Sequence, residues 1–262
     1  AQPTSDVVLT ITSDDTGEAT VNNPLTFTPA NWDTPQTITV TGVDDSIIDG
    51  TITSTITIAV DDANSDDDFD AVTDQTVSVD ITDDDVAGFT IEETEGSTEV
   101  DEAGSTDTFT IVLDAQPTND VVVLATASND ETEAIVSGSI TFTSENWDTP
   151  QTVTVTGVDD DLVDGDQTYD ITISIVDTIS DDDFDGVADQ SVSSTTLDDD
   201  APGFTIEETD AATEVDESGT TDTFTVVLDA QPTSDVVLTI TSDDTDEATV
   251  NNPLTFTPVN WD

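Results

Sequence analysis

Hydrophobic and polar positions alternate with a period of two along most of the chain, which predicts short β-strands. Thr, Val and Ile dominate these segments, as they do on half-buried pleated surfaces, and no helical pattern of useful length is present. In the stretch 88–200 the pattern predicts seven strands, at residues 89–91, 108–113, 121–126, 139–143, 152–156, 169–175 and 191–197. Seven short strands in about 110 residues, separated by acidic turns, are typical of an immunoglobulin-like β-sandwich.

The strand pattern is part of an internal repeat. The sequence GFTIEET at residues 88–94 returns at residues 203–209, a spacing of 115 residues. Asn-Trp-Asp, which first occurs at residues 31–33, also returns once in each later repeat, at residues 146–148 and 260–262. A unit of this length has a normal domain size, so we expect an all-β chain of tandem seven-strand immunoglobulin-like sandwiches.

The repeat divides the chain into three units. We expect residues 1–87 to form a partial sandwich without its first strands, residues 88–202 a complete sandwich, and residues 203–262 the first half of another. We therefore interpret the chain as a segment of a longer array. Residues 1–33 and 230–262 differ only at positions 17/246 and 30/259, which suggests two alternating unit types with a super-repeat of 229 residues.

The net charge changes this picture. The chain has 62 Asp and Glu residues and no Lys, Arg or His, so its formal charge is −62 with no basic side chain to offset it. Acidic chains with few aromatic residues are often disordered. The 34% hydrophobic content, arranged in orderly alternating runs, argues for a folded chain instead. A folded chain of this kind needs cations from outside.

The acidic residues are concentrated in consecutive runs, such as 159–161 and 198–200. Two like charges ~4 Å apart cost about 4 kcal/mol at a surface-like dielectric, whereas a domain is stable by only ~5–15 kcal/mol. One interpretation of these runs is a solvated acidic loop without bound cations, and the other is a calcium site. Calcium binds 6–8 oxygen ligands from carboxylates, carbonyls and water, and consecutive Asp residues in an irregular turn can supply them. The clusters therefore predict bound calcium, with several ions per repeat.

Three motifs in the complete unit resemble the Calx-beta domain family. They are VDEAG at residues 100–104, GVDDDLVDGD at 157–166, and a last strand that ends on LDDD at 197–200. The junction DDDVAGFTIEE at residues 83–93 is similar to the joint between tandem domains of that family. The resemblance covers nearly the whole unit. It implies a seven-strand sandwich with a cluster of calcium ions at one end, beside the next domain.

The resemblance also implies a ligand set. In the complete unit the implied ligands are Glu102, Asp130, Asp159, Asp160, Asp161, Asp164, Asp198, Asp199 and Asp200. The corresponding positions in the flanking units are Asp15, Asp44, Asp45, Asp49, Asp83, Asp84, Asp85 and Glu217. The first unit departs from the pattern, with Ser46 in place of Asp161 and Thr51 in place of Asp166, so we expect weaker or fewer ions there.

A second candidate calcium loop is independent of the resemblance. Residues 181–186 match the D-x-D-x-D-G opening of an EF-type loop, but Val192 replaces the final Glu and no flanking helices are predicted. A plain acidic turn is the alternative. The candidate ligands are Asp181, Asp183, Asp185 and Asp189, with Asp66, Asp68, Asp70 and Asp74 as their counterparts in the first unit.

The aromatic residues favour a packing role. Trp32, Trp147 and Trp261 each occur once per unit, before a predicted strand, so core or domain-edge packing is favoured over sugar stacking. Phe89 and Phe204 follow the short linkers, and we expect both to anchor a first strand in its core.

Composition excludes several functions. Without Lys or Arg the chain cannot bind nucleic-acid phosphates. Without His, Cys or Lys it lacks the usual nucleophiles and bases, and we expect no enzymatic activity. No apolar run approaches the ~20 residues of a membrane span. Two functions remain open: a calcium-stabilised structural array of an extracellular filament, stalk or cell-surface adhesin, and an adhesive module that binds a glycan or protein directly. The expected partners are neighbouring repeats, assembled end to end.

Overall fold

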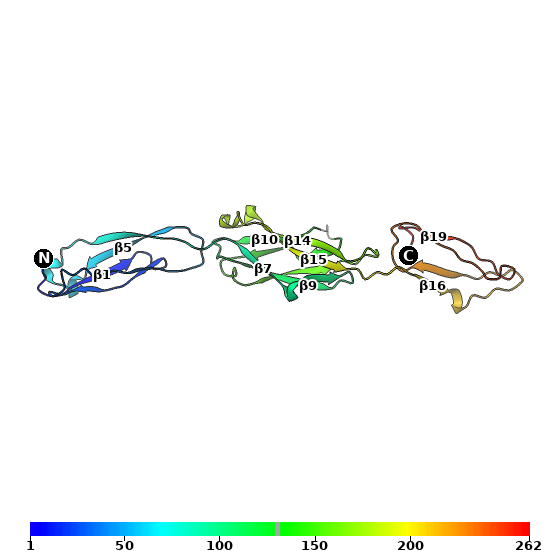
Figure 1. Cartoon of the computed structure of the whole chain (residues 1–262), viewed down its shortest axis with the longest axis horizontal. Helices are drawn as coiled ribbons and strands as arrows, with labels where there is room; N and C mark the ends of the chain where they lie inside the picture. Colours follow the sequence, from blue (N-terminus) through cyan, green and yellow to red (C-terminus); the bar gives the residue numbers. More distant parts are fainter. Residues whose placement is uncertain (129–131) are drawn as a thin grey trace.

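The structure is a computed structural model in which residues 1–128 and 132–262 are described. The protein is all-β, with short 3-10 helices as its helical elements in the described ranges. The three sequence units lie one after another along the long axis of the molecule (Figure 1). None of the helices in the described chain has the length and apolarity needed to cross a membrane.

The central unit is a sandwich of two sheets. One sheet has the order β12-β10-β14-β15-β8, formed by Ser139–Phe142, Val121–Ala127, Gln167–Ile175, Gln190–Leu197 and Thr98–Asp101. The other has the order β11-β13-β9-β7, formed by Ala134–Val136, Gln151–Gly157, Thr106–Leu113 and Phe89–Glu93. Each of the seven predicted strands is confirmed. The short strands β8 and β11 are additional, since neither carries a long enough alternating run to be predicted.

The core of the protein lies between these two sheets. Phe109, Phe142 and Phe184 are fully buried in it, and Phe89 is 3% exposed. Trp147 packs against the same core, which confirms its predicted packing role. The inward side chains alternate with exposed ones along β13 and β14, so the period-two pattern of the sequence is the pattern of the two faces.

The sheets of the flanking units contain fewer paired strands than those of the central unit. In residues 1–87 the strands are Val7–Ser13 (β1), Ala19–Val21 (β2), Leu25–Phe27 (β3), Val40–Gly42 (β4), Ile52–Val60 (β5) and Gln75–Ile81 (β6). They form one sheet of order β3-β1-β5-β6 and a separate pair β2-β4. In residues 203–262, Phe204–Glu208 (β16) pairs with Phe224–Leu228 (β17), and Val236–Leu238 (β18) pairs with Leu254–Phe256 (β19).

The expectation for Phe204 is wrong. Its side chain is 52% exposed, because residues 203–262 form two separate two-stranded sheets with no opposite sheet to cover β16. The remaining elements are 3-10 helices at Asp62–Asn64 (η1), Asp67–Phe69 (η2), Thr94–Gly96 (η3), Asp177–Ile179 (η4), Asp182–Phe184 (η5) and Thr209–Ala211 (η6).

The units contact each other through the acidic loops. The amide of Gln116 donates to the carbonyl of Ser46 at 2.7 Å, and Ile47 forms a parallel bridge with Gln116. Ile48 packs against the core of the central unit. The second joint repeats this contact, with the amide of Gln231 donating to the carbonyl of Asp161 at 2.6 Å. Each joint therefore joins an acidic loop directly to the next unit.

Candidate metal centre

Strands β8 and β15 bring two acidic segments to one end of the central sandwich. The two strands are parallel, with Asp101 paired to Leu197, so the segments that follow them both begin at the same end of the sheet. The amide of Glu102 then donates to the carbonyl of Leu197 at 3.2 Å. Glu102 is thereby held beside the acidic run 198–200.

Gly157 brings the third segment to the same place. It ends β13, and an added β-carbon there would collide with the carbonyl oxygen of Asp101. The amide of Gly157 donates to Ser105 at 3.0 Å, which fixes the close approach. Only a residue without a β-carbon fits, and it places the following acidic loop, residues 158–166, against Asp101 and Glu102.

Asp198 holds the end of the last strand to this loop. One carboxylate oxygen of Asp198 accepts from the amide of Gly165 at 2.7 Å, and the other accepts from the amide of Asp200 at 2.9 Å. Asp83 makes the same two contacts in the first unit, with the amides of Gly50 and Asp85. The carboxylates of Asp198 and Asp83 thus accept hydrogen bonds from backbone amides. The next two Asp residues in each run follow directly after them.

Glu102, Asp199 and Asp200 form a compact carboxylate cluster. Each offers an oxygen atom within 4.8 Å of the others. Glu102 is 1% exposed, and neither of its oxygen atoms has a hydrogen-bond partner; Asp200 Oδ2 is also buried without one. Burial raises the pKa of Glu102 to about 7 against the opposing effect of the nearby backbone amide of Asp199, and the charges of Asp160 and Asp198 add to the rise. Buried carboxylate oxygens without a donor need a cation or a proton.

A second carboxylate cluster, in the first unit, uses a residue that the sequence does not single out. In the first unit Glu18, Asp45 and Asp49 place carboxylate oxygens within 4.8 Å of one another. In the central unit the counterpart of Glu18 is Glu133, whose Oε2 atom is buried without a partner. Burial raises the pKa of Glu133, and Asp164 and Asp160 raise it further. The available signal was the shared Glu-Ala pair at residues 18–19 and 133–134, immediately before a short strand.

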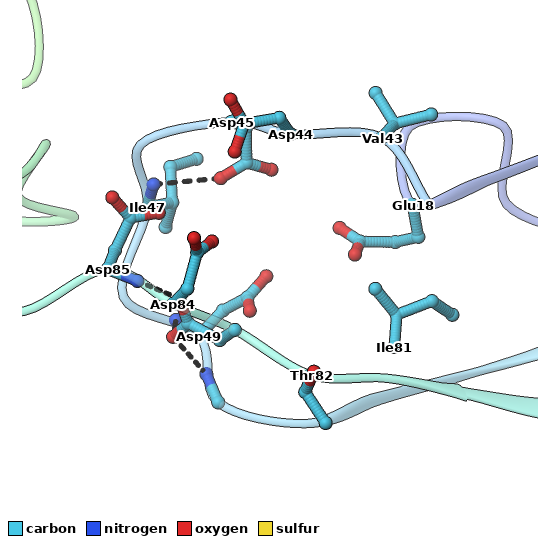
Figure 2. A pocket seen from close by; sticks show the side chains of 12 residues that line it. Glu18, Val43, Asp44, Asp45, Ile47, Asp49, Ile81, Thr82, Asp84 and Asp85 are labelled. Carbon is cyan, nitrogen blue, oxygen red and sulfur yellow. Dashed lines mark hydrogen bonds between the residues drawn. The ribbon is translucent and has the colours of Figure 1, made fainter. Parts of the chain in front are cut away.

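In the first unit these side chains surround a small cavity of about 30 Å³. Figure 2 shows Glu18 facing Asp45 and Asp49 across it, from separate segments of the chain. Seven carboxylates line the cavity: Glu18, Asp44, Asp45, Asp49, Asp83, Asp84 and Asp85. Burial and the neighbouring charges of Asp49 and Asp45 raise the pKa of Glu18. Among the described residues no basic side chain is present to neutralise this group.

The remaining implied ligands lie around these clusters. Asp159 and Asp161 are in the same loop as Asp160 and Asp164, and the carbonyl of Asp161 forms the joint with Gln231. Asp15 uses one oxygen to accept from the amide of Gly17 at 2.9 Å. Glu217 is exposed in the third unit. Asp130 lies outside the described residues.

The EF-like loops have a different local structure from an ion-binding turn. Asp181 is 3% exposed and caps η5 by accepting from the amide of Asp183; its other oxygen accepts from the amide of Asn119 at 2.6 Å and from the hydroxyl of Thr118. Burial opposes ionisation, yet these hydrogen bonds lower the pKa of Asp181. The other candidates are exposed: Asp183, Asp185 and Asp189, and Asp68, Asp70 and Asp74.

Asp66 has the same role in the first unit. The amide of Ser5, with the hydroxyl and amide of Thr4, lowers the pKa of Asp66 to about 2. In the described parts of the chain, the groups of three acidic residues close enough to share an ion are the two described above, and neither includes these loops. Calcium binding by the EF-like loops stays a prediction.

The clusters at the sandwich end fit calcium. Their donors are carboxylate oxygens, which a hard divalent cation prefers, and several of these oxygens are buried without any other partner. They come from three segments that only the fold brings together. In the central unit Glu102, Asp199 and Asp200 are the residues close enough to share an ion. Glu133 would be a further ligand, because its buried oxygen has no partner and the charges of Asp164 and Asp160 raise its pKa.

No protein-family model and no curated protein matches the chain. Among solved structures, domains 4 and 5 of the S-layer protein SbsC are 18% identical, with 72% of this chain and 70% of that chain covered and a TM-score of 0.35. The apo-form Calx CBD1 domain is 17% identical over 43% of this chain and 98% of that one, with a TM-score of 0.32. The D0-D1 domain of intimin is 14% identical over 73% and 81%, with a TM-score of 0.29. These structures are β-sandwich domains, and the chain is similar to them in fold class alone.

Proposed function

We propose that the chain is a calcium-stabilised structural array from an extracellular filament, stalk or cell-surface adhesin. The complete sandwich 88–202 and the partial units 1–87 and 203–262 would carry load along the array, and calcium would bind at the end of each complete unit. The observation that supports this most is Glu102, a fully buried carboxylate with two unpartnered oxygens. Such a group is stabilised by a cation and destabilises the fold without one.

The position of the clusters supports a mechanical role. Asp45 and Asp49 flank the three residues, 46–48, that contact the central unit, and Asp160 and Asp164 flank the contact at Asp161 and Leu162. When bound, calcium supplies positive charge that these carboxylates share. Without it, their mutual repulsion acts on the loop that forms the joint. Ion binding and the stiffness of the joint are therefore coupled through one short segment.

Extracellular placement rests on calcium availability. Calcium sites of extracellular modules bind calcium at about 10⁻⁴–10⁻³ M. Such affinities suit the calcium concentration outside cells. The chain also contains no Cys, so its stability depends on neither disulfides nor a reducing compartment.

Calcium titration by calorimetry, together with thermal unfolding in calcium and in chelator, tests the proposal. Binding to the native state alone adds RT ln(1 + [Ca²⁺]/Kd) per site to stability, so the melting temperature should rise steadily with calcium. Magnesium at equal ionic strength is the control, since it demands smaller octahedral sites. If calcium produces no binding heat and no rise in melting temperature beyond that of magnesium, the proposal fails.

A further inference from the structure

Three hydroxyl groups are buried together inside the central sandwich, near the end that carries the acidic loops. Ser194 and Thr196 on β15 are 0% exposed, and Tyr169 on β14 is 7% exposed. The core cluster that contains Tyr169 is otherwise made of apolar side chains. A hydroxyl group in such a core is costly unless it is hydrogen-bonded, so the partners of these three groups show what they do.

The three hydroxyls form one directed chain of hydrogen bonds. Ser194 Oγ donates to Tyr169 Oη at 3.1 Å, and Tyr169 Oη lies 3.2 Å from Thr196 Oγ1. Thr196 Oγ1 donates to the main-chain carbonyl of Glu133 at 3.2 Å. Because a hydroxyl has one proton to donate, Thr196 must accept from Tyr169, and the chain runs from Ser194 to Glu133. Hydrogen bonds arranged in this way strengthen one another in a protein interior.

The carbonyl of Glu133 is the point where three segments of the sandwich meet. It accepts from Thr196, two residues before the acidic run 198–200, and from the amide of Val158 at 2.9 Å, where the acidic loop begins. Glu133 itself lies directly before β11. Two donors use both lone pairs of this carbonyl. The group of Glu133 that remains for a cation is its side-chain carboxylate, whose Oε2 atom is buried without a partner among the described residues.

Two of the three hydroxyl positions are apolar in the first unit. The counterparts of the three residues are Ser54, Val79 and Ile81. The carbonyl of Glu18 accepts from the amide of Val43 at 2.9 Å, as that of Glu133 does from Val158, but Ile81 has no proton to donate to it. Strands β5 and β6 nevertheless pair in the same register as β14 and β15. The hydroxyl chain is therefore not needed for the strand pairing itself.

We propose that Tyr169, Ser194 and Thr196 are positioning residues for Glu133, and that they fix its carboxylate as an ion ligand of the central unit. The proposal rests on the proposed function, because it needs a cation at this end of the sandwich. Thr196 holds the main chain of Glu133 to β15, and the amide of Val158 holds it to the acidic loop. A ligand whose main chain is fixed at two points loses less freedom when it binds an ion, which raises the affinity.

Calcium titration of the 262-residue chain by calorimetry tests the positioning role. T196V removes the hydroxyl and keeps the shape of the side chain. It should weaken binding of the ion that Glu133 holds by about tenfold or more, as loss of an outer-shell contact does. T196S keeps a hydroxyl and should bind as the parent does. T195V is the matched control, because the Thr195 hydroxyl is paired with that of Thr168 on the exposed side of the sheet, and it should leave the affinity unchanged.

A double-mutant cycle separates positioning from general packing. E133Q should weaken the same ion, because it removes the charge of the ligand. If Thr196 acts through Glu133, T196V should add little to the loss that E133Q already causes, so the two effects on affinity should be strongly non-additive. Equal losses from T196V in the parent and in E133Q would overturn the positioning role, because the hydroxyl would then act independently of Glu133.

The hydroxyl chain also has a signal that needs no calcium. Tyr169 is the one tyrosine of the sequence, so carbon-13 labelling at its Cζ atom gives a single resonance that responds to the hydrogen bonds of the phenol. Without calcium this resonance should move in T196V and in S194A and stay in place in T195V. A resonance that T196V and S194A leave unchanged would overturn the chain. Y169F removes only the donor to Thr196, and it tests the role if T196V does not fold: its calcium affinity should also fall.

The outcomes separate the two proposals. If the parent binds calcium and both T196V and Y169F bind it equally tightly, the positioning role is overturned and the proposed function stands. If the parent binds no calcium, the proposed function fails, and the positioning role fails with it, even where the Tyr169 resonance shows that the hydroxyl chain is present. Weaker binding in T196V and Y169F, with T196S and T195V like the parent, is the result that supports both.

Discussion

The backbone amide of Glu102 is hydrogen-bonded to the carbonyl of Leu197, 3.2 Å away, across the parallel pair β8 and β15. This contact places a buried glutamate beside an acidic run that begins 96 positions later in the chain. Among the described residues no donor makes a hydrogen bond of normal geometry to its side-chain oxygens, although the backbone amide of Asp199 is near enough to oppose the rise in its pKa. The relationship predicts how the protein responds to calcium, to pH and to changes in the loops around it.

Replacing Glu102 by Gln removes the negative charge of the side chain and keeps its shape, so it separates the effect of the charge on stability from that of packing. Without calcium we expect E102Q to melt at a higher temperature than the parent, because it removes a buried charge that nothing offsets. With calcium the parent should gain much more stability than E102Q, since the variant has lost one ligand. Differential scanning calorimetry in both conditions measures this. The matched control is E92Q on β7, an exposed glutamate, which should change neither value; equal calcium gains for E102Q and the parent would contradict the assignment.

Stability should depend on pH in opposite directions with and without calcium. The folded pKa of Glu102 is about 7 against an ordinary value of 4.5, so its contribution is fully present below 4.5 and is lost as pH rises through 7. The calcium-free protein should therefore become more stable as the pH falls from about 8 to about 5. Calcium favours the ionised form and lowers the folded pKa, so the loaded protein should lose stability over the same range.

Below about pH 5 the protein should lose stability as the pH falls, both with and without calcium. The folded pKa of Asp66 is about 2 against an ordinary 3.8, so its contribution is present above 3.8 and is lost as pH falls towards 2. Melting temperatures from about pH 8 to pH 2, with calcium and with chelator, give the two curves. If the calcium-free curve fell continuously from neutral pH, the buried Glu102 would not be the dominant charge.

Gly157→Ala should disrupt the metal centre through the backbone alone. The new methyl group collides with the carbonyl of Asp101 and forces the acidic loop away from Glu102. Overpacking of this kind costs about 1–3 kcal/mol of unfolding free energy. Gly186→Ala is the control, because no atom lies within 4 Å of the added carbon and the loop is far from the clusters. G157A should lose both stability and calcium affinity, and a loss confined to stability would show that the loop does not position ligands.

Ile48→Ala should loosen the first joint and leave each sandwich folded. Ile48 packs from the acidic loop onto the core of the central unit, so its truncation removes apolar contact between units. Small-angle scattering in calcium should give a broader distribution of lengths for I48A than for the parent. V237A, at a side chain that is 57% exposed in the third unit, should scatter as the parent does. If chelator leaves the parent's maximum dimension and its spread unchanged while the domains stay folded, calcium does not stiffen the joint.

The alternating pattern was sufficient to predict the seven main strands, because each strand of the central sandwich buries one face and exposes the other. The pattern could not predict β8, a four-residue strand whose stability comes from pairing with β15 far along the chain. Glu133 was missed for a similar reason. It lies outside the consecutive Asp runs, and only the fold brings it to Asp160 and Asp164.

Motif spacing was less informative where the same residues have a structural use. The D-x-D-x-D run at 181–185 contains Asp181, whose oxygens already accept hydrogen bonds from Asp183, Asn119 and Thr118. The run also contains Phe184, a fully buried core residue. A capped 3-10 turn and an ion-binding loop share this sequence signal, because both need short acidic side chains that bind backbone amides.

The contact between Ser46 and Gln116 recurs, 115 residues later, between Asp161 and Gln231 (Figure 1). The two joints share the same backbone hydrogen bond and the same parallel bridge, so each unit meets the next through equivalent backbone segments. A head-to-tail contact that is repeated without closing into a ring generates a helical array. Residues 46–48 and their counterparts 161–163 are therefore the segments whose geometry would set the pitch and handedness of an array built from these units.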